Sequence, residues 1–137
     1  MNILFLCTGN SCRSQMAHGL ASKLWPEVTV YSGGTKTHGL NTNAVKVMEE
    51  VGVDISHHTS NLLSEYDHIT FDIIYTVCSD AHENCPYVPN AKILHVGFDD
   101  PPRLTKGMTN EDEILNVYRR VRDEIKTFIE RCQHTAN

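Results

Sequence analysis

The stretch NILFLCTGNSCRSQMAHGLASKL, residues 2–24, decides the fold because it joins a strand pattern, a polar turn and a helix pattern. Residues 2–6, NILFL, form a short run that is apolar after Asn2, which predicts a buried strand. Beyond the turn at 7–13, apolar residues recur at helical spacing over 14–24. A strand that leads through a turn into a helix is typical of α/β proteins.

The alternation of strands and helices continues along the chain. Apolar, β-branched or aromatic runs predict three further strands at 28–32, 71–77 and 91–96. With the first strand and the intervening helices, they predict an α/β fold of about four mostly parallel strands flanked by helices. We expect a single three-layer domain that spans residues 1–137.

Caps mark two further helices. Residues 43–51 carry apolar side chains at helical intervals, and Gly52 is the expected stop. Either Thr42 or Asn43 is the expected N-cap of this helix. A capping-box pattern that starts at Thr109 opens the long last helix.

Composition and charge exclude several classes of function. The 137 residues include 12 Lys+Arg and 17 Asp+Glu, a net charge of −5, which disfavours nucleic acid or an anionic membrane as a partner. No apolar run approaches the roughly 20 residues of a membrane helix, and no basic region precedes the first strand as in a signal peptide. We therefore expect a cytoplasmic protein with no nucleic-acid or membrane partner, in which any anion is bound locally.

The turn CTGNSCR, residues 7–13, has the features of an oxyanion-binding loop. It lies between the carboxyl end of a strand and a helix N-terminus, whose free N–H groups attract anions. Gly9 and Asn10 tolerate positive φ, so successive amides can point inward. Arg13 offers a planar fork for two oxyanion oxygens. The same positive field should lower the pKa of Cys7 and make it a nucleophile.

Other residues of the turn have supporting or uncertain roles. Ser14 could donate a hydrogen bond to the thiolate of Cys7. Cys12 is more simply a bystander thiol, because spacing does not fix its direction. An ordinary strand-end turn with a free cysteine is the alternative, which the flanking strand and helix disfavour. We expect these residues to bind the oxyanion or support the loop: Thr8, Gly9, Asn10, Ser11, Cys12, Arg13 and Ser14.

Two downstream cysteines need a separate explanation. Cys78 lies at the end of a predicted buried strand, and Cys85 follows seven residues later in a polar segment. With His82 they could form part of a zinc site, but no fourth ligand is evident nearby. Two unreactive buried thiols are a further alternative. His82 itself is expected to be a solvated loop residue.

A carboxylate pair, Asp99 and Asp100, follows the fourth predicted strand and precedes Pro101. A carboxyl group at this edge of the sheet can protonate a leaving oxygen if its pKa is raised. Asp and Pro also favour plain turns, and the residues alone leave the two interpretations equal.

Five motifs carry a family resemblance: CTGNSCRSQMA at 7–17, THG at 37–39, DISHHTS at 54–60, VCSDAHENCP at 77–86 and GFDDP at 97–101. Together they resemble the arsenate reductases of the low-molecular-weight phosphatase fold, which thioredoxin recycles. The resemblance implies a four-stranded parallel sheet with arsenate held in the 7–13 loop, and with phosphate or sulfate as analogues.

The resemblance also implies roles for individual residues. Cys7 resembles the nucleophile, Arg13 the oxyanion clamp and Asp100 the general acid. Cys78 would displace arsenite from Cys7, and Cys85 would then attack Cys78. The final disulfide between Cys78 and Cys85 would be reduced by thioredoxin, although a glutaredoxin system stays open. No cofactor is implied.

The alternative function is a phosphomonoesterase, such as a low-molecular-weight protein tyrosine phosphatase, that uses Cys7, Arg13 and Asp100. Pro102 weakens this interpretation, because such tyrosine phosphatases usually place an aromatic residue after the Asp-Pro pair. Weak phosphatase activity could persist beside arsenate reduction.

Some reductases of this type hold a potassium ion beside the loop. The matching positions here are Asn10, His18, Ser32 and Asn61, which lack two carboxylates. We therefore predict no strong potassium site and no other metal.

The pair at 57–58, His-His, is expected to cap and pack rather than bind metal. Cys132 has no expected role.

Overall fold

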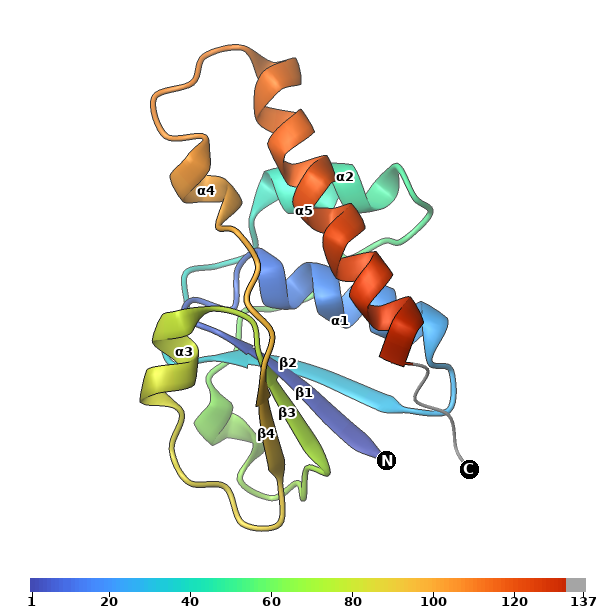
Figure 1. Ribbon diagram of the computed structural model, residues 1–137, viewed down its shortest axis with the longest axis vertical. Coiled ribbons are helices and arrows are strands. Elements are labelled where there is room, and N and C mark those ends of the chain that lie inside the picture. Colours follow the sequence, from blue (N-terminus) through green and yellow to red (C-terminus); the bar gives the residue numbers. More distant parts are fainter. Residues whose placement is uncertain (133–137) are drawn as a thin grey trace.

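The sheet has four parallel strands in the order β2-β1-β3-β4 (Figure 1). The computed structural model describes residues 1–132. The strands are β1 (Asn2–Cys7), β2 (Thr29–Gly34), β3 (Ile73–Thr76) and β4 (Lys92–His95). This confirms the predicted four-stranded parallel sheet.

β1 occupies the centre because it is apolar on both faces. Ile3, Leu4 and Leu6 are fully buried. A central parallel strand is covered above and below, so it needs a continuous apolar run instead of an alternating one. Cys7 is its last residue and lies at the carboxyl edge of the sheet.

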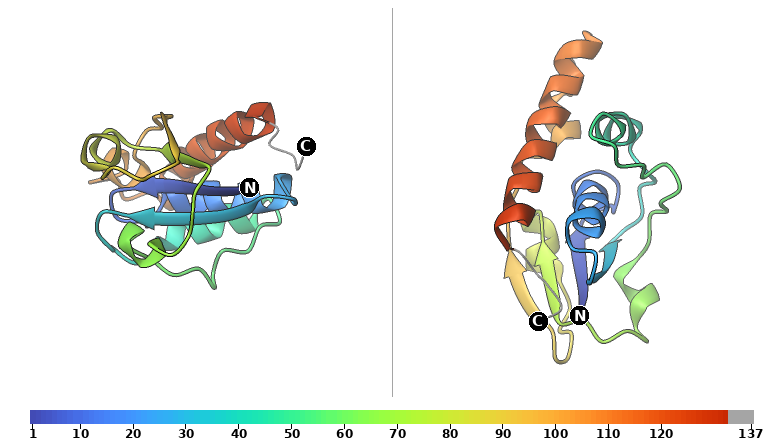
Figure 2. Two further views of the ribbon diagram at one scale, coloured as in Figure 1. Left: turned by 90° about the horizontal axis from the view of Figure 1, so that it is seen from below. Right: turned by 90° about the vertical axis from the view of Figure 1, so that its right-hand side faces the viewer.

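The helices are α1 (Arg13–Leu24), α2 (Thr42–Glu49), η1 (Leu63–Tyr66), α3 (Ser79–Asn84), α4 (Pro101–Leu104) and α5 (Glu111–Cys132). α5 packs against α1 and α2, and it crosses α1, which is seen nearly end-on beside the upright α5 in the right-hand view (Figure 2). On the opposite face of the sheet, the Tyr31 ring of β2 contacts Tyr66 of η1 and Phe71. Tyr31 and Phe5 face opposite sides because Phe5 pairs with Ser32, the next residue of β2.

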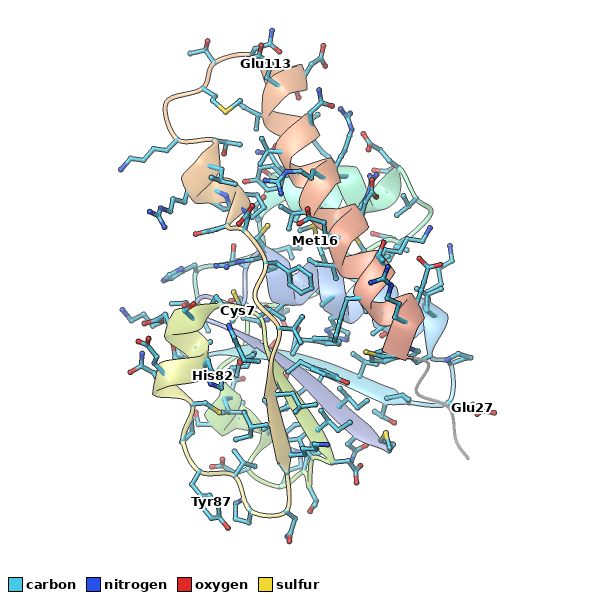
Figure 3. All side chains as sticks on the ribbon, viewed as in Figure 1. Cys7, Met16, Glu27, His82, Tyr87 and Glu113 are labelled. Carbon is cyan, nitrogen blue, oxygen red and sulfur yellow. The ribbon has the colours of Figure 1, made fainter. Side chains whose placement is uncertain are left out.

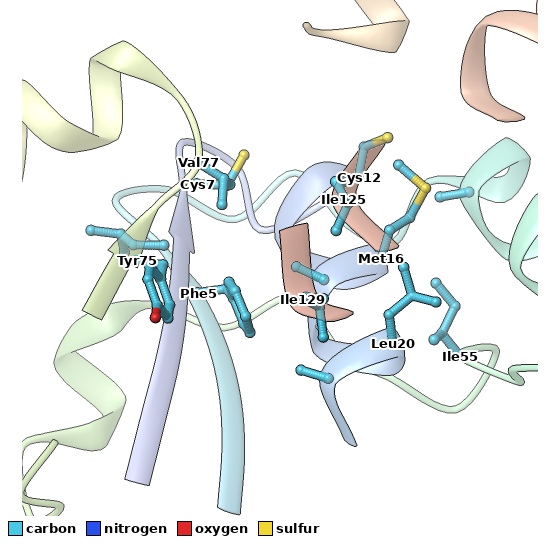
Figure 4. Packing of buried hydrophobic residues seen from close by; sticks show 14 of the residues in the cluster. Phe5, Cys7, Cys12, Met16, Leu20, Ile55, Tyr75, Val77, Ile125 and Ile129 are labelled. Atoms are coloured by element: carbon cyan, nitrogen blue, oxygen red, sulfur yellow. The ribbon is translucent and has the colours of Figure 1, made fainter. Parts of the chain in front are cut away.

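Aromatic rings join the sheet to α1 and α5 (Figure 4). The Phe5 ring stacks on Tyr75 at 5.5 Å and on Trp25 at 6.1 Å between centroids. The Trp25 indole donates a hydrogen bond of 3.1 Å to the Ile129 carbonyl of α5. This packing fixes β1 and α1, and therefore the loop between them.

The caps of two helices differ from the prediction. α2 is capped by Asn41, whose side chain accepts from the Ala44 amide at 3.0 Å, and not by Thr42 or Asn43. Gly52 does follow the helix, with φ of 76°. α5 begins at Glu111, because the Asn110 side chain accepts from the Glu113 amide at 3.1 Å. The capping box predicted from Thr109 is therefore wrong by one residue.

Candidate active site

The β1–α1 loop folds tightly around Asn10, which is fully buried and has φ of 47°. Its amide donates to Ser14 Oγ at 2.9 Å, and its Oδ1 accepts from the Asn61 backbone N–H at 2.8 Å. The expected positive φ is thus confirmed at Asn10 but not at Gly9. Gly9 is needed for space instead, because a Cβ there would collide with the His38 ring.

Cys7 and Cys78, from neighbouring strand ends, lie in hydrogen-bond contact and are both buried (Figure 3 labels Cys7). The bond between the two thiols and burial raise the pKa of Cys7 well above its usual value. The same bond, with hydrogen bonds from Thr8 and the Ala81 amide and the charge of Arg13, lowers the pKa of Cys78 to about 5.

The prediction that Cys7 carries the lowered pKa is therefore wrong for the resting pair of thiols. The bond between the two thiols raises the pKa of Cys7 and lowers that of Cys78, and the Ala81 amide favours the thiolate at Cys78. Ser14 Oγ accepts a hydrogen bond from the Asn10 side chain, which leaves its hydroxyl proton free, so its expected support of the Cys7 thiolate stays a prediction.

Arg13 extends from the first turn of α1 toward the β4–α4 connection. Its Nη1 donates to the Phe98 carbonyl at 3.0 Å, and its Nη2 lies 3.7 Å from Asp100 Oδ2. Its Nε is buried with no hydrogen-bond partner in the described residues. A buried guanidinium N–H without a partner is costly, so this atom is suited to donate to a bound oxyanion.

A cavity of about 410 Å³ opens beside these groups. Its lining includes Arg13, Cys78, Ser79, Asp100 and Arg103. Of the two predicted carboxylates, Asp99 forms an ion pair with Arg120 at 3.1 Å. Asp100 is left as the carboxylate beside Arg13.

Cys78 and Cys85 lie at opposite ends of α3, where the sequence indicated only a polar segment. The Ala81 amide donates to Cys78 Sγ at 3.4 Å, and Cys85 is the C-cap. Seven helical steps place the two Cα atoms about 10 Å apart. A disulfide needs them within about 7 Å, so these two thiols cannot pair while α3 is folded.

The start of α3 is bound to the loop by a contact that sequence reasoning missed. The Thr8 hydroxyl donates to Asp80 Oδ2 at 2.8 Å and lies 3.2 Å from Cys78 Sγ. These partners are some seventy positions apart in the chain, and no local pattern signals them.

His82 is also placed differently from the prediction. It is solvent-exposed as expected, but it belongs to α3 and not to a loop, and its Nδ1 lies 3.0 Å from the Thr76 hydroxyl. Within residues 1–132, no three His, Cys, Asp or Glu side chains converge on a point that could hold a metal.

Three of the four positions compared with a potassium site, His18, Ser32 and Asn61, line one cavity of about 310 Å³, and Asn10 is not part of its lining. However, His18 Nδ1 is bonded to Ser32 Oγ at 2.9 Å, and Asn10 Oδ1 is taken by the Asn61 amide. Burial and the neighbouring His58 and His57 lower the pKa of His18 to about 4. The described lining of this cavity includes no carboxylate, and a neutral imidazole does not fit a hard cation.

The remaining predicted residues have packing roles. His58 Nδ1 is bonded to Gln15 Oε1 at 2.9 Å. Burial raises the pKa of Cys12 to about 12, which leaves it an unreactive thiol. The Tyr75 hydroxyl donates to Cys132 Sγ at 3.9 Å.

The chain belongs to the family described as low molecular weight phosphotyrosine protein phosphatase, whose model matches residues 2–135. It is 51% identical over 130 residues to a protein of Staphylococcus haemolyticus named arsenate reductase 2, covering 93% of this chain and 92% of the relative.

Solved structures agree with this family. A structure titled as an arsenate reductase in the oxidized state superposes with a TM-score of 0.78 at 30% identity, covering 95% of this chain and 94% of the other. Another structure, titled as an arsenate reductase in the phosphate binding state, superposes with a TM-score of 0.76 at 29% identity, covering 96% of this chain and 95% of the other. No helix among residues 1–132 has the length and apolar character to span a membrane.

Proposed function

We propose that this protein reduces arsenate to arsenite by a relay through Cys7, Cys78 and Cys85. The position of Cys78 carries the proposal: its Sγ lies 3.2 Å from the hydroxyl of Thr8, the residue after Cys7, and ester hydrolysis needs no second thiol beside the nucleophile. The relatives named arsenate reductase, at about half sequence identity over nearly the whole chain, support it.

In the first step, the loop amides and Arg13 hold the arsenate oxygens. The proton of Cys7 passes along its hydrogen bond to Cys78, and the Cys7 thiolate attacks arsenic. Asp100 gives a proton to the departing hydroxide, which leaves as water. An S–As bond replaces an As–O bond, and arsenic stays in oxidation state five.

In the second step, Cys78 loses its proton to solvent in the cavity and attacks the Cys7 sulfur. The S–As bond breaks, and its electron pair stays on arsenic. Arsenic is thereby reduced to arsenite by two electrons, while the two thiols are oxidised to a Cys7–Cys78 disulfide.

In the third step, Cys85 attacks the Cys78 sulfur and Cys7 leaves as a thiolate. α3 has to unwind, because its two ends are too far apart for a disulfide. Unwinding also exposes Cys85, whose pKa is raised by burial. Thioredoxin then reduces the Cys78–Cys85 disulfide, which places the enzyme in the reducing cytoplasm.

The test is mass-spectrometric mapping of disulfides after one equivalent of arsenate. We expect Cys78 joined to Cys85 in the wild type and Cys7 joined to Cys78 in Cys85→Ser. Thioredoxin-coupled NADPH oxidation should require both downstream thiols, whereas any aryl phosphate hydrolysis should survive in Cys78→Ser and Cys85→Ser. Free Cys78 and Cys85 after arsenate, with coupled turnover intact in both variants, would contradict the relay.

Phosphatase activity is the second candidate, because ester hydrolysis needs only Cys7, Arg13 and Asp100. Arg13 and Asp100 line one cavity, and Cys7 lies beside Cys78, which lines the same cavity. The family description favours it. We assign it as a side activity, since Pro102 stands where an aromatic side chain would stack on a tyrosine ring.

A further inference from the structure

Outside the cavity described above, two histidines meet on one buried hydroxyl. The Thr76 side chain ends β3 and is fully buried. Its Oγ1 lies 3.0 Å from His82 Nδ1 and 3.0 Å from His95 Nδ1, and the two imidazole centroids are 4.7 Å apart. Figure 3 shows His82 on the side of α3 that faces the sheet.

The two hydrogen bonds of the Thr76 hydroxyl depend on each other. A hydroxyl has one proton to donate, so Thr76 donates to one imidazole and accepts from the N–H of the other. Each bond therefore fixes the tautomer that the other bond requires. The result is a chain of contacts from α3 through β3 to β4.

This contact holds the half of α3 that leads to Cys85. The first half is held by the Thr8–Asp80 bond. Among residues 1–132, the bond from His82 is the only side-chain hydrogen bond from the later residues of α3 to the sheet. Loss of this bond should therefore release the end of the helix that carries the third thiol.

We propose that His82, acting through Thr76 and paired with His95, is a positioning residue that affects the rates of two thiol steps in opposite directions: it speeds attack by Cys78 and slows attack by Cys85. This inference rests on the proposed relay. Attack by Cys78 is favoured by folded α3, because the Ala81 amide then donates to the Cys78 sulfur. Attack by Cys85 requires unwound α3. The His82–Thr76–His95 contact therefore favours the first attack and delays the second.

Matched variants distinguish the loss of this contact from a nonspecific destabilisation of the fold. His82→Ala removes the contact from the helix side, and Thr76→Val removes the hydroxyl from the sheet side. His82→Asn keeps a polar atom near the position of Nδ1 and should restore the contact. Glu83→Ala is the control, because Glu83 is exposed on the same helix and makes no side-chain hydrogen bond within the described residues.

Hydrogen exchange of the reduced protein tests the contact without arsenate. Amides of 80–84 should exchange roughly two- to tenfold faster in His82→Ala and Thr76→Val, the effect of one net hydrogen bond, and at the wild-type rate in His82→Asn and Glu83→Ala. Equal exchange in His82→Ala and Glu83→Ala would overturn the inference and leave the relay standing.

Rapid-quench single turnover then follows arsenite release and the two disulfides. In His82→Ala, arsenite release should slow and conversion of the Cys7–Cys78 to the Cys78–Cys85 disulfide should accelerate, each by a few-fold. Aryl phosphate hydrolysis should not change. Slowing of both thiol steps would indicate a merely structural role and overturn the inference. If the wild type forms no arsenate-dependent disulfide, the relay fails, whatever the exchange result.

Discussion

The thiols of Cys7 and Cys78 share one proton, and the residues around them decide where it resides. Cys78 accepts from the Ala81 amide and lies 3.2 Å from the Thr8 hydroxyl, while the bond to Cys78 and burial act against ionisation of Cys7. The resting pair therefore stores its negative charge on the second thiol of the relay. Oxyanion binding must therefore move the negative charge from Cys78 to Cys7 before Cys7 can attack.

The pH dependence of Cys7 alkylation tests this arrangement. The bond to Cys78 is the largest cause that raises the pKa of Cys7, so Cys78→Ala should lower the midpoint of Cys7 alkylation relative to the wild type. The sign follows because the variant keeps the Arg13 charge, which favours the thiolate. Site-resolved mass spectrometry across a pH series measures it. Cys85→Ala is the control, and an unchanged or higher midpoint in Cys78→Ala would contradict the shared proton.

At the residue scale, the sequence predicted the loop well and its partners poorly. Cys7 and Arg13 are adjacent to a strand end and a helix start, so local pattern places them. The partners of Arg13 are the Phe98 carbonyl, 85 positions away, and Asp100. The lowered pKa of Cys78 also depends on contacts between residues that are far apart in the sequence, and a local sequence pattern does not predict such contacts.

At the scale of elements, α2 is joined to α5 through one carboxylate. Glu50, the C-cap of α2, pairs with Arg119 at 2.7 Å and with Arg122 at 2.9 Å. Arg122 is buried and also donates to the Val47 carbonyl at 2.8 Å. These bonds fix the C-terminal end of α2 against the middle of the long helix.

This junction should make stability depend on pH in the acid range. The hydrogen bond from Arg119 is the largest cause that lowers the pKa of Glu50 to about 2. A lowered carboxyl pKa stabilises the fold above the pKa of the unfolded chain, and the effect is lost as pH falls through about 2.

Urea unfolding at several pH values measures this contribution. Glu50→Gln should cost about 0.5–1 kcal/mol at pH 7, because a half-exposed pair is screened by solvent. The difference from the wild type should vanish toward pH 2. Glu49→Gln is the control, since Glu49 is exposed and makes no ion pair among residues 1–132. A difference that persists unchanged at pH 2 would contradict the argument.

The elements themselves were predictable where the pattern was long. Four strands and three long helices follow from apolar periodicity, whereas α3 does not. Its sequence SDAHEN is short and polar, and its helical form rests on the Thr8–Asp80 and Thr76–His82 contacts with distant strands. The caps at Asn41 and Asn110 were missed because neighbouring Thr and Asn residues have equal local preference.

At the scale of the whole molecule, a net charge of −5 opposes the approach of an arsenate dianion. The cavity mouth offsets this repulsion with Arg103, an exposed side chain that forms no ion pair within the described residues. Arg13 is occupied in the interior of the cavity, so Arg103 is the cation that an arriving anion meets first.

Arg103→Ala should therefore raise the KM for arsenate a few-fold with little change in kcat, because Arg103 lines the cavity without a hydrogen bond to Cys7 or Cys78 among the described residues. The dependence of kcat/KM on ionic strength should also weaken, since exposed charges are screened over about 10 Å at 0.1 M salt. Steady-state kinetics at several salt concentrations measures both effects. Lys106→Ala makes the same change in net charge from outside the cavity and should leave KM nearly unchanged. Equal effects of the two substitutions would show that overall charge, and not the position of Arg103, controls the approach of the substrate.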